Sequence, residues 1–455
     1  MNSEESTLLE IAVKMLNIHV LCDRCLGRQF AWLGTGTSNK DRGHSIKLTL
    51  TMMADGNLRS GNKEQGMRDI RLLAENGMFT PAKEIATKNA IEFETRSTCY
   101  LCAAPGLDSF FDRIPHIAER IVELSHDIEF DTFLVGSVPP PTLVEHQDEL
   151  NAMYSLLHSE TLKSHFNREL GIHLHSLLGK EVDFDKPDIV YVYAMDKDEL
   201  KLQVNPLFIF GRYCKLERGI PQSRWDCKKC KGKGCPECEG TGRRYQDSIS
   251  EYVGIPSQQL VNGTRFKFHA AGREDVDVLM LGDGRPFVVE ISEPRVRHLD
   301  LEELARKIND YARGKIEVHD LKMTDRQHLQ KLKYDASSNV KEYKALIRTE
   351  SIVEDELLTR AQKELTGIEI EQRTPNRVSH RRSDLVRKKQ IHEIIFKGYK
   401  EELLEAFFKV QGGTYIKELI SGDEGRTKPS VAEKLGTPCV CTELNVTAIY
   451  SEDSQ

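Results

Sequence analysis

The chain has 455 residues, of which 30% are charged, and its net charge at pH 7 is -7. This length predicts about three domains of roughly 150 residues each. The sequence contains no apolar run of about 18 residues, which excludes a membrane-spanning helix, and its acidic opening MNSEEST lacks the basic start of a secretion signal. We therefore expect a cytoplasmic protein with no membrane partner.

The first segment, residues 1–105, is expected to be a zinc-stapled module. Thr7 with Glu10 three residues later has the pattern of a helix N-terminus, and residues 26–98 have a mostly helical, polar pattern. In a chain without a secretion signal, C-x-x-C pairs favour tetrahedral zinc over disulfides. Two such pairs bracket this segment: Cys22, Cys25, Cys99 and Cys102.

Residues 106–200 alternate between helical patterns and short apolar strands, which predicts an α/β domain. The expected helices span residues 117–124 and 154–170, and the expected strands are FDTFLVGSV and DIVYVYAM. The prolines of VPPPT predict a rigid, exposed loop after the first strand.

The third segment, residues 201–455, is expected to carry a zinc knuckle insert at residues 225–240, around the sequence CKKCKGKGCPECEGTG of residues 227–242. Its C-x2-C-x4-C-x2-C spacing supplies four metal ligands, and its glycines permit two tight knuckles, which predicts a structural zinc site. The four ligands would be Cys227, Cys230, Cys235 and Cys238. We interpret the remaining cysteines, Cys214, Cys439 and Cys441, as ordinary buried thiols. Two C-x-x-C-x-G-x-G copies also resemble the Hsp40 chaperones, but that family has four copies and a His-Pro-Asp motif, which this chain lacks.

Dense strand patterns from residue 264 onward predict an α+β fold with a large antiparallel sheet. The expected strands are RFKFHAA, a hairpin over residues 272–291, IEVHDL, NVKEYKALIRT and CTELNVTAIY, with helices at residues 301–313 and 391–407. Two stretches are basic within this acidic chain. Residues 201–250 have eleven Lys or Arg against five Asp or Glu, and residues 371–400 have nine against three.

Asp275 and Asp277 lie two apart in GREDVDVLMLGDGRPFVVEI and would share one face of a strand. On the residues alone three interpretations stay open. The pair could bind a divalent cation, it could face solvent, or Asp275 could be a nucleophile kept ionised by a cation such as Arg273.

Three motifs resemble those of the pseudouridine synthases: GRED with Asp275, KEYKALI with Tyr343, and GGTYIKEL with Tyr415 and Lys417. Five blocks in the same order resemble, more narrowly, the archaeal Pus-ten type of tRNA pseudouridine synthase. These blocks are CDRCLGRQFAWLG, GRYCKLERGIPQSRW, GREDVDVLMLGDGRPFVVEI, TPNRVSHRRSD and GDEGRTKPS. The chain departs from the resemblance at Leu279, where the family has an arginine.

The resemblance implies an accessory domain of THUMP type, a pseudouridine synthase core, and action on uridines 54 and 55 in the TΨC arm of tRNA. It implies Asp275 as the nucleophile, paired with Lys417, and Tyr343 as a stacking platform for the target base. We expect Tyr415 and Leu444 to contact the same base. Phosphate contacts are expected from Arg377, Arg381, Arg382 and the lysines of residues 228–233.

Because the isomerisation involves no redox or phosphoryl change, we expect no catalytic cofactor, only structural zinc. We expect tRNA as the partner and a monomeric protein. The alternative function is that of a non-catalytic, zinc-containing tRNA-binding protein, and an Hsp40-like peptide chaperone is a weaker competitor.

Overall fold

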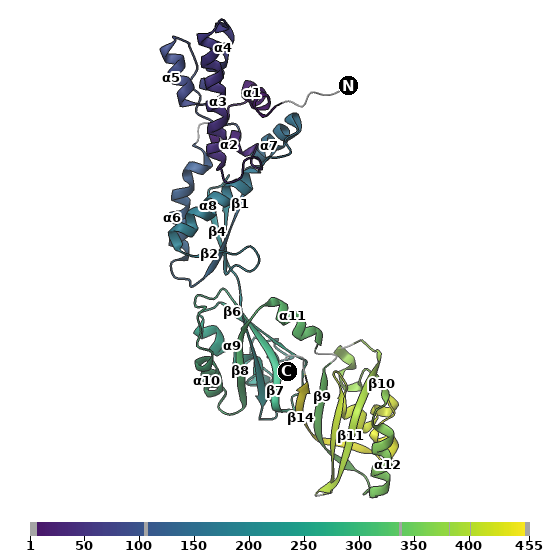
Figure 1. Ribbon diagram of the computed structural model, residues 1–455. Coiled ribbons are helices and arrows are strands. Elements are labelled where there is room, and N and C mark those ends of the chain that lie inside the picture. The colour runs from purple at the N-terminus through teal and green to yellow at the C-terminus, as the bar shows by residue number, and fades with distance from the viewer. Residues whose placement is uncertain (1–6, 104–107, 336–338, 382, 401, 451–455) are drawn as a thin grey trace, which may run out of the picture. The chain divides into compact units, whose positions relative to one another are not determined.

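The computed structural model describes residues 7–103, 108–335, 339–381, 383–400 and 402–450, without the side chains of residues 380 and 381. The chain divides into two compact units, residues 1–205 and 206–455 (Figure 1). The further division of the first unit at residue 105 stays a prediction. None of the described helices is long and apolar enough to cross a membrane.

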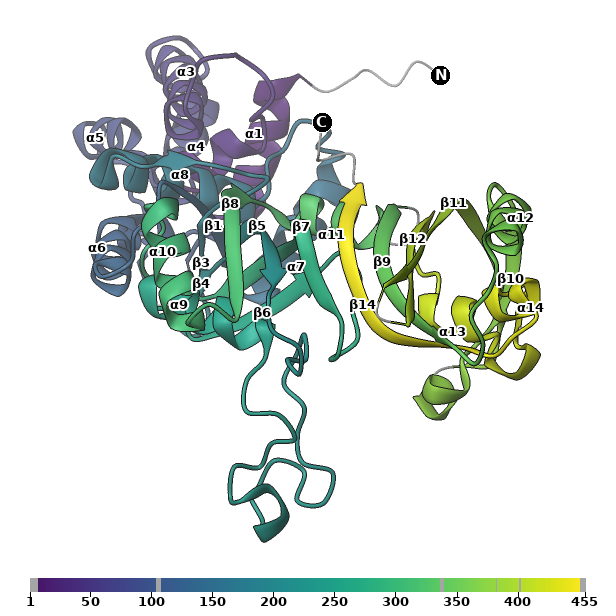
Figure 2. The same ribbon diagram turned by 90° about the horizontal axis from the view of Figure 1, so that it is seen from below.

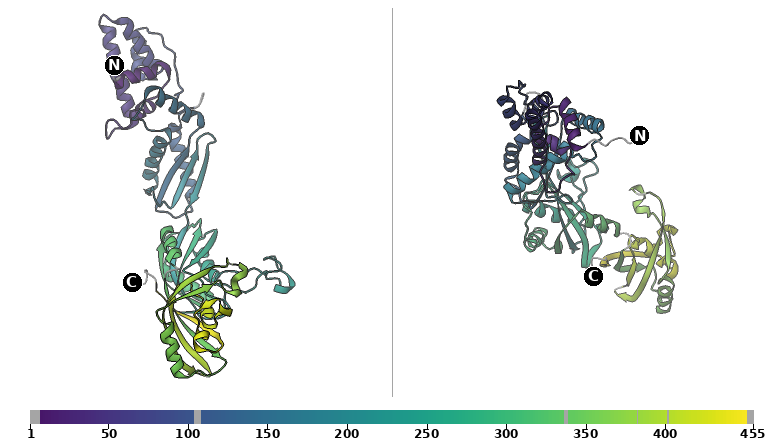
Figure 3. Two further views of the ribbon diagram at one scale, coloured as in Figure 1. Left: turned by 90° about the vertical axis from the view of Figure 1, so that its right-hand side faces the viewer. Right: turned by 45° about the horizontal axis from the view of Figure 1, so that its top comes forward.

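The first unit begins with helices, as the sequence predicted. The side-chain hydroxyl of Thr7 accepts from the backbone of Glu10 at 3.3 Å, and the Glu10 carboxylate accepts from the backbone of Thr7 at 2.9 Å, so α1 begins at the expected capping box. The next helices pack in sequence, α2 on α3, α3 on α4 and α4 on α5 (Figures 1 and 3). Their bounds are α1 Leu8–Ile18, α2 Asp23–Arg28, α3 Asn39–Arg59, α4 Lys63–Glu75 and α5 Thr80–Lys88.

The rest of the first unit is a four-stranded sheet with helices packed against it. The strand order is β2-β1-β3-β4, with β1 parallel to both β2 and β3 and with β4 antiparallel to β3. The alternating burial of β1 and β3 shows that one face of the sheet packs into the core. The elements are η1 Phe110–Arg113, α6 Ile114–Ser125, β1 Thr132–Val138, α7 Pro141–Tyr154, α8 Leu162–Leu178, β2 Glu181–Val182, β3 Ile189–Ala194 and β4 Glu199–Val204.

Two expectations in this region are wrong. The VPPPT segment is only partly a loop. Helix α7 begins at its Pro141, where the fixed φ of proline suits the first turn of a helix. The helix expected over residues 154–170 is instead the end of α7 and the beginning of α8, separated at Ser155, which has a left-handed backbone with φ of 49°.

The second unit is built on a ten-stranded, mainly antiparallel sheet, as predicted. Its order is β13-β10-β11-β12-β9-β14-β7-β5-β8, and β6 also pairs with β7. The pairing of β14 with β7 is parallel and joins the two halves of the sheet (Figure 2). The strands are β5 Leu207–Lys215, β6 Arg265–Ala270, β7 Leu279–Ser292, β8 Ile316–Thr324, β9 Val340–Thr349, β10 Glu369–Arg373, β11 Val386–Lys400, β12 Leu403–Gln411, β13 Thr427–Lys428 and β14 Cys439–Tyr450.

Helices cover both faces of this sheet. Five helices contribute to one core together with alternate residues of the strands, whereas α11 packs on a smaller cluster that contains Phe208, Phe210 and Val288. Strand β5 is therefore buried on both faces. The five helices are α9 Ile249–Leu260, α10 Leu301–Ala312, α12 Asp355–Leu365, α13 Ile416–Ser421 and α14 Val431–Leu435, and α11 spans Arg326–Asp335. Short 3-10 turns occur at η2 Pro236–Cys238, η3 Asn376–Arg381 and η4 Asp423–Gly425.

Two further expectations are wrong. Residues 272–291 form no hairpin, because β7 runs as one strand along β5, with Met280 opposite Lys215 and Arg285 opposite Tyr213. The residues between Met280 and Arg285 bulge out of the ladder. Gly282 is required there, because a β-carbon would lie 2.0 Å from the carbonyl oxygen of Thr447. The helix expected at residues 391–407 is instead the antiparallel pair β11 and β12.

Candidate active site and metal centres

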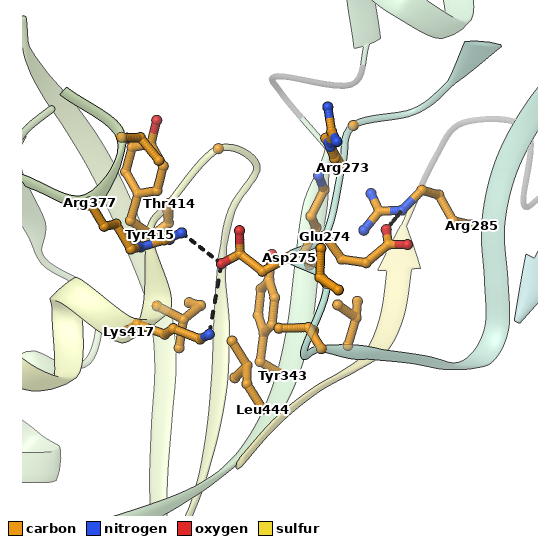
Figure 4. A pocket seen from close by; sticks show the side chains of 18 of the residues that line it. Arg273, Glu274, Asp275, Arg285, Tyr343, Arg377, Thr414, Tyr415, Lys417 and Leu444 are labelled. Atoms are coloured by element: carbon orange, nitrogen blue, oxygen red, sulfur yellow. Dashed lines mark hydrogen bonds and ion pairs between the residues drawn. The ribbon is translucent and has the colours of Figure 1, made fainter. Parts of the chain in front are cut away.

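A cleft of about 570 Å³ in the second unit brings together residues from several separate segments of the chain (Figure 4). The loop between β6 and β7 carries Asp275, and β9 carries Tyr343. Tyr415 and Lys417 come from the segment at the start of α13, and Leu444 comes from β14. The structure therefore places together the five residues that the three sequence motifs and the final strand had suggested.

The Asp275 carboxylate lies between two cations. Oδ2 of Asp275 is 2.8 Å from Nη1 of Arg377 and 3.9 Å from Nζ of Lys417 (Figure 4). Lys417 lies closer to Asp277, whose Oδ2 it contacts at 2.6 Å. Partial burial would raise the pKa of Asp277, but this hydrogen bond from Lys417 lowers it below its ordinary value. Among the described side chains the closest cation to Asp275 is therefore Arg377, and Lys417 bridges both aspartates.

Arg377 is itself fixed by several neighbours. Its guanidinium also pairs with the buried Glu418 and lies 6.0 Å from the ring centre of Tyr415. Burial opposes the charged form, but the carboxylates of Glu418 and Asp275 raise the pKa of Arg377. Of the other predicted phosphate ligands, the side chain of Arg381 is not described, and Arg382 lies outside the described residues.

The inner side of the loop is held by a buried ion pair that the sequence did not suggest. Nε of Arg285 donates to the Glu274 carboxylate at 2.8 Å, and the two side chains are 1% and 2% exposed. The hydroxyl of Tyr213 donates to the same carboxylate at 2.9 Å, and Gln222 donates to that hydroxyl at 3.0 Å and to the carbonyl of Gly272 at 2.9 Å. Burial and the Glu274 charge raise the pKa of Tyr213 well above its usual value. Each of these contacts joins residues of different strands or loops, so no local sequence signal could have found them.

Two more cations fix the backbone of the loop. Lys215 is fully buried and donates to the carbonyls of Asp275 at 3.2 Å and Val276 at 2.8 Å. Burial lowers the pKa of Lys215 to about 8. Arg218 donates to the carbonyls of Asp277 at 2.6 Å and Leu444 at 3.0 Å, which ties the loop to β14. These contacts leave the Asp275 side chain projecting into the cleft from a fixed backbone.

The aromatic and apolar walls of the cleft come from neighbouring strands. In the ladder between β9 and β14, Tyr343 is opposite Val446 and Ala345 is opposite Leu444. Burial raises the pKa of the Tyr343 phenol to about 12. The backbone of Tyr415 is held on both sides by the buried side chain of Gln372, which donates to its carbonyl at 3.0 Å and accepts from its N–H at 2.9 Å. The departing residue, Leu279, begins β7 and is opposite Asn445.

Both predicted cysteine tetrads are assembled. In each, the four sulfur atoms lie within 4.8 Å of one another, close enough to hold one metal ion. In the first tetrad three of the four cysteines are buried, and the backbone N–H of Cys22 donates to Sγ of Cys99 at 3.4 Å. Burial would raise the pKa of Cys99, but hydrogen bonds from Cys102, Cys22 and Cys25 lower it well below its usual value. At Cys99 these donors stabilise the thiolate, the form of cysteine that binds zinc.

The second tetrad lies on the long loop between β5 and α9, which projects from the sheet (Figure 2). Its two halves are alike: Gly234 N–H donates to Sγ of Cys230 and Gly242 N–H to Sγ of Cys238, each at 3.2 Å. Gly234 and Gly242 have φ of 89° and 67°, as tight knuckles require. Of the cysteines outside the tetrads, Cys214 and Cys439 are buried as predicted, whereas Cys441 is partly exposed.

Comparisons with known proteins cover nearly the whole chain. A family model described as "Pus10, C-terminal" matches residues 208–450, and one described as "Pus10 THUMP domain, archaeal" matches residues 117–194. A protein named tRNA pseudouridine synthase Pus10 from Methanothrix thermoacetophila is 39% identical over 445 residues, covering 98% of this chain and 95% of its own. A protein of the same name from Methanocaldococcus jannaschii is 38% identical, covering 97% and 95%.

Among solved structures, a chain from a Cbf5-Nop10-Gar1 complex aligns with 52% of this chain and 60% of its own at 18% identity, with a TM-score of 0.28. We draw no argument from this weak likeness. The family models themselves confirm the predicted THUMP-type α/β part and the predicted core of the second unit.

Proposed function

The chain belongs to the Pus10 family of tRNA pseudouridine synthases, and we propose that it isomerises uridines 54 and 55 in the TΨC arm of tRNA with Asp275 as the nucleophile. The observation that carries this proposal is the placement of Asp275. Its side chain is 35% exposed in the cleft, its carboxylate lies 2.8 Å from Arg377, and buried groups hold its backbone in place. A reactive carboxylate needs this combination of access and fixed orientation.

The reaction breaks the N1–C1′ bond of uridine, turns the base, and joins C5 to C1′. Asp275 would act either by attacking C1′ or by removing a ribose proton, and both routes need the ionised carboxylate. Arg377 and Lys417 place two positive charges beside this carboxylate. Because substrate and product are isomers, the reaction needs no net oxidant, reductant or group donor, and we propose that no diffusible cofactor takes part.

Tyr343 is our candidate for the platform on which the flipped uracil stacks. Removing a base from its helix costs a few kcal/mol, and stacking on an aromatic ring returns about 1–3 kcal/mol. Leu444 lies one strand away on β14 and would form the apolar floor under the ring, with Tyr415 as a second contact. The cleft lining thus supplies an aromatic platform, an apolar floor and a carboxylate to one nucleoside.

We propose that Arg381, Arg382 and the lysines of residues 228–233 contact tRNA phosphates. Neutralising them should weaken tRNA binding more than turnover, because phosphate contacts position the nucleic acid without taking part in the chemistry. Arg377 has two carboxylate partners in the described structure, so we assign it to the orientation of Asp275 in addition to the phosphate contact expected from sequence.

We propose that both tetrads hold structural zinc. Their four sulfur ligands and N–H donors fit a closed tetrahedral site, which stabilises the fold and leaves no coordination position for catalysis. Elemental analysis of the purified protein should find zinc in both tetrads, and cysteine-to-serine substitution in one tetrad should halve the zinc content. We further propose a monomer that acts on tRNA in the cytoplasm.

The deciding experiment uses unmodified tRNA that carries tritium at C5 of uridine. We expect the wild-type protein to release tritium, with pseudouridine mapped to positions 54 and 55. We expect Asp275→Asn to bind the tRNA but to release no tritium. An active Asp275→Asn variant would show that another group is the nucleophile. Binding without release by the wild-type protein would favour the alternative, a non-catalytic tRNA-binding protein.

A further inference from the structure

The lysine of the KEYKALI motif, Lys341, lines the catalytic cleft. It lies two residues before Tyr343 on β9, and residues two apart in a strand point to the same side. The Lys341 residue is only 5% exposed, and among the described residues its ammonium has no hydrogen-bond or ion-pair partner. It lies against the loop between β6 and β7 that carries Asp275, called the catalytic loop below, because a β-carbon added to Gly272 would be 2.9 Å from Nζ of Lys341.

The other buried or half-buried cations of the cleft have carboxylate partners. Arg285 pairs with Glu274, Arg377 with Asp275, and Lys417 with Asp277. These pairs leave Lys341 as a buried ammonium whose counter-charge is missing from the described residues, although buried charges in proteins are usually paired.

Three charged groups face Lys341 from the elements packed around it: Arg285 on β7, Glu274 on the catalytic loop, and Lys389 on β11. Burial and the Arg285 charge lower the pKa of Lys341 to about 7, against the opposing effect of Glu274. The site therefore has an excess of positive charge that an incoming anion would neutralise.

The isomerisation creates such an anion. When the N1–C1′ bond breaks, its electron pair leaves with the base, and the uracil ring carries one negative charge shared by N1, O2 and O4. The ring then turns, and C5 bonds to C1′ as the Asp275 carboxylate leaves C1′ or returns its proton to the ribose. The C5 proton is then lost to water and N1 takes up a proton from water, so that the product is an isomer of the substrate. A uracil stacked on Tyr343 would lie within reach of Lys341, because two residues of a strand span only about 6–7 Å.

Resting on the proposed function, we propose that Lys341 is a catalytic residue whose ammonium pairs with the uracil anion formed when the glycosidic bond breaks. Such a contact is stronger in the transition state than with the neutral substrate, which is the condition for accelerating the reaction. This role explains why none of the described carboxylates of the cleft pairs with Lys341, since a permanent counter-charge would cancel the effect.

The test is the substitution Lys341→Met in the full-length protein, followed by single-turnover tritium release from the labelled tRNA. We expect the rate to fall by about 100-fold or more, and the Kd for tRNA to change by less than about threefold. The melting temperature should stay the same or rise, because the substitution removes an unpaired buried charge.

Lys344→Met is the matched control, because Lys344 lies on the opposite face of β9 and pairs with Glu405 at 2.9 Å. It should retain the wild-type rate within about twofold. The pH profile gives a second readout: the wild-type rate should fall as the pH rises above about 7, because the neutral amine has no charge to offer, and Lys341→Met should lack this fall.

Four results would overturn the role of Lys341. In Lys341→Met these are an unchanged rate, a rate loss explained by a lower melting temperature, and weaker tRNA binding with a smaller salt dependence, which indicates a phosphate contact. In the wild type it is a rate that rises with pH through this range, as a general base would give. A wild-type protein that releases no tritium would instead overturn the proposed function itself, and the Lys341 proposal with it.

Discussion

Two ion pairs hold the loop between β6 and β7, which carries Asp275, and they differ mainly in their access to water. On the inner side, Glu274 and Arg285 meet at 2.8 Å with side chains that are 2% and 1% exposed. On the outer side, Asp277 and Lys417 meet at 2.6 Å with side chains that are 67% and 24% exposed. The distances are similar, but the two environments give the pairs different consequences.

Exposed pairs contribute about 0–1 kcal/mol to stability, because water and salt screen the charges. Removing one partner of a buried pair costs about 3–5 kcal/mol, because the other charge is left without compensation. The inner pair therefore fixes the position of the loop, whereas the outer pair holds Lys417 beside Asp275 at little cost to folding. Within one loop, the buried pair of Glu274 and Arg285 therefore holds the geometry, and the exposed pair of Asp277 and Lys417 sets nearby charge.

The largest expected effect comes from breaking the inner pair. Arg285→Met should lower the free energy of unfolding of the second unit by about 3–5 kcal/mol, because Glu274 stays buried without its cation. Urea denaturation of the full chain, followed by hydrogen exchange in β6 and β7, measures this loss. Turnover by the fraction that stays folded should fall by about 100-fold, because the loop that carries Asp275 shifts.

The double variant Glu274→Leu with Arg285→Met is the control for this prediction. It removes both charges, so it should regain at least half of the stability lost in the single variant, although Tyr213 loses its acceptor. If the double variant is no more stable than the single one, the cost lies in packing and the comparison of the two pairs fails.

The sequence predicted those parts of the site whose signals are local. The cysteine tetrads follow from ligand spacing, and the Asp275, Tyr343 and Tyr415 motifs each occupy a few consecutive residues. The pair between Glu274 and Arg285 depends on how the bulge in β7 places residues eleven apart, which no local pattern encodes. Lys417 was assigned to Asp275 alone, although it lies closer to Asp277, because contacts between residues this far apart in the chain are likewise not encoded by a local pattern.

The wrong helix at residues 391–407 has a physical cause. Ile391 and Ile394 both face the core although they are three residues apart, because a register shift between Ile391 and Glu393 interrupts the alternation of β11. Apolar residues three apart imitate the spacing of a helix. Strand β12, which has no such shift, keeps a strict alternation of buried and partly exposed residues.

A smaller effect is expected from Lys417→Met, which breaks the outer pair. The free energy of unfolding should change by less than about 1 kcal/mol, whereas turnover should fall by about tenfold because a cation near Asp275 is lost. Lys388→Met is a matched control: it breaks the exposed pair with Glu369 at 3.0 Å, outside the cleft, and should leave turnover unchanged. A loss of stability above about 2 kcal/mol in Lys417→Met would show that the outer pair also holds the loop.

The smallest effect is the pH dependence of that same outer pair. The hydrogen bond from Lys417 lowers the pKa of Asp277 in the folded protein below its ordinary value of 3.8, despite partial burial. The folded state therefore binds this proton less readily than the unfolded state, so the pair stabilises the fold fully above that value and loses its effect as the pH falls through the lowered pKa. Urea midpoints of wild type and Lys417→Met should differ at pH 6, and the difference should shrink as the pH falls below 3.8 through the lowered pKa. A difference that persists at the acidic end would mean that Lys417 stabilises the loop through its hydrocarbon chain, and the outer pair would then resemble the inner one in holding geometry.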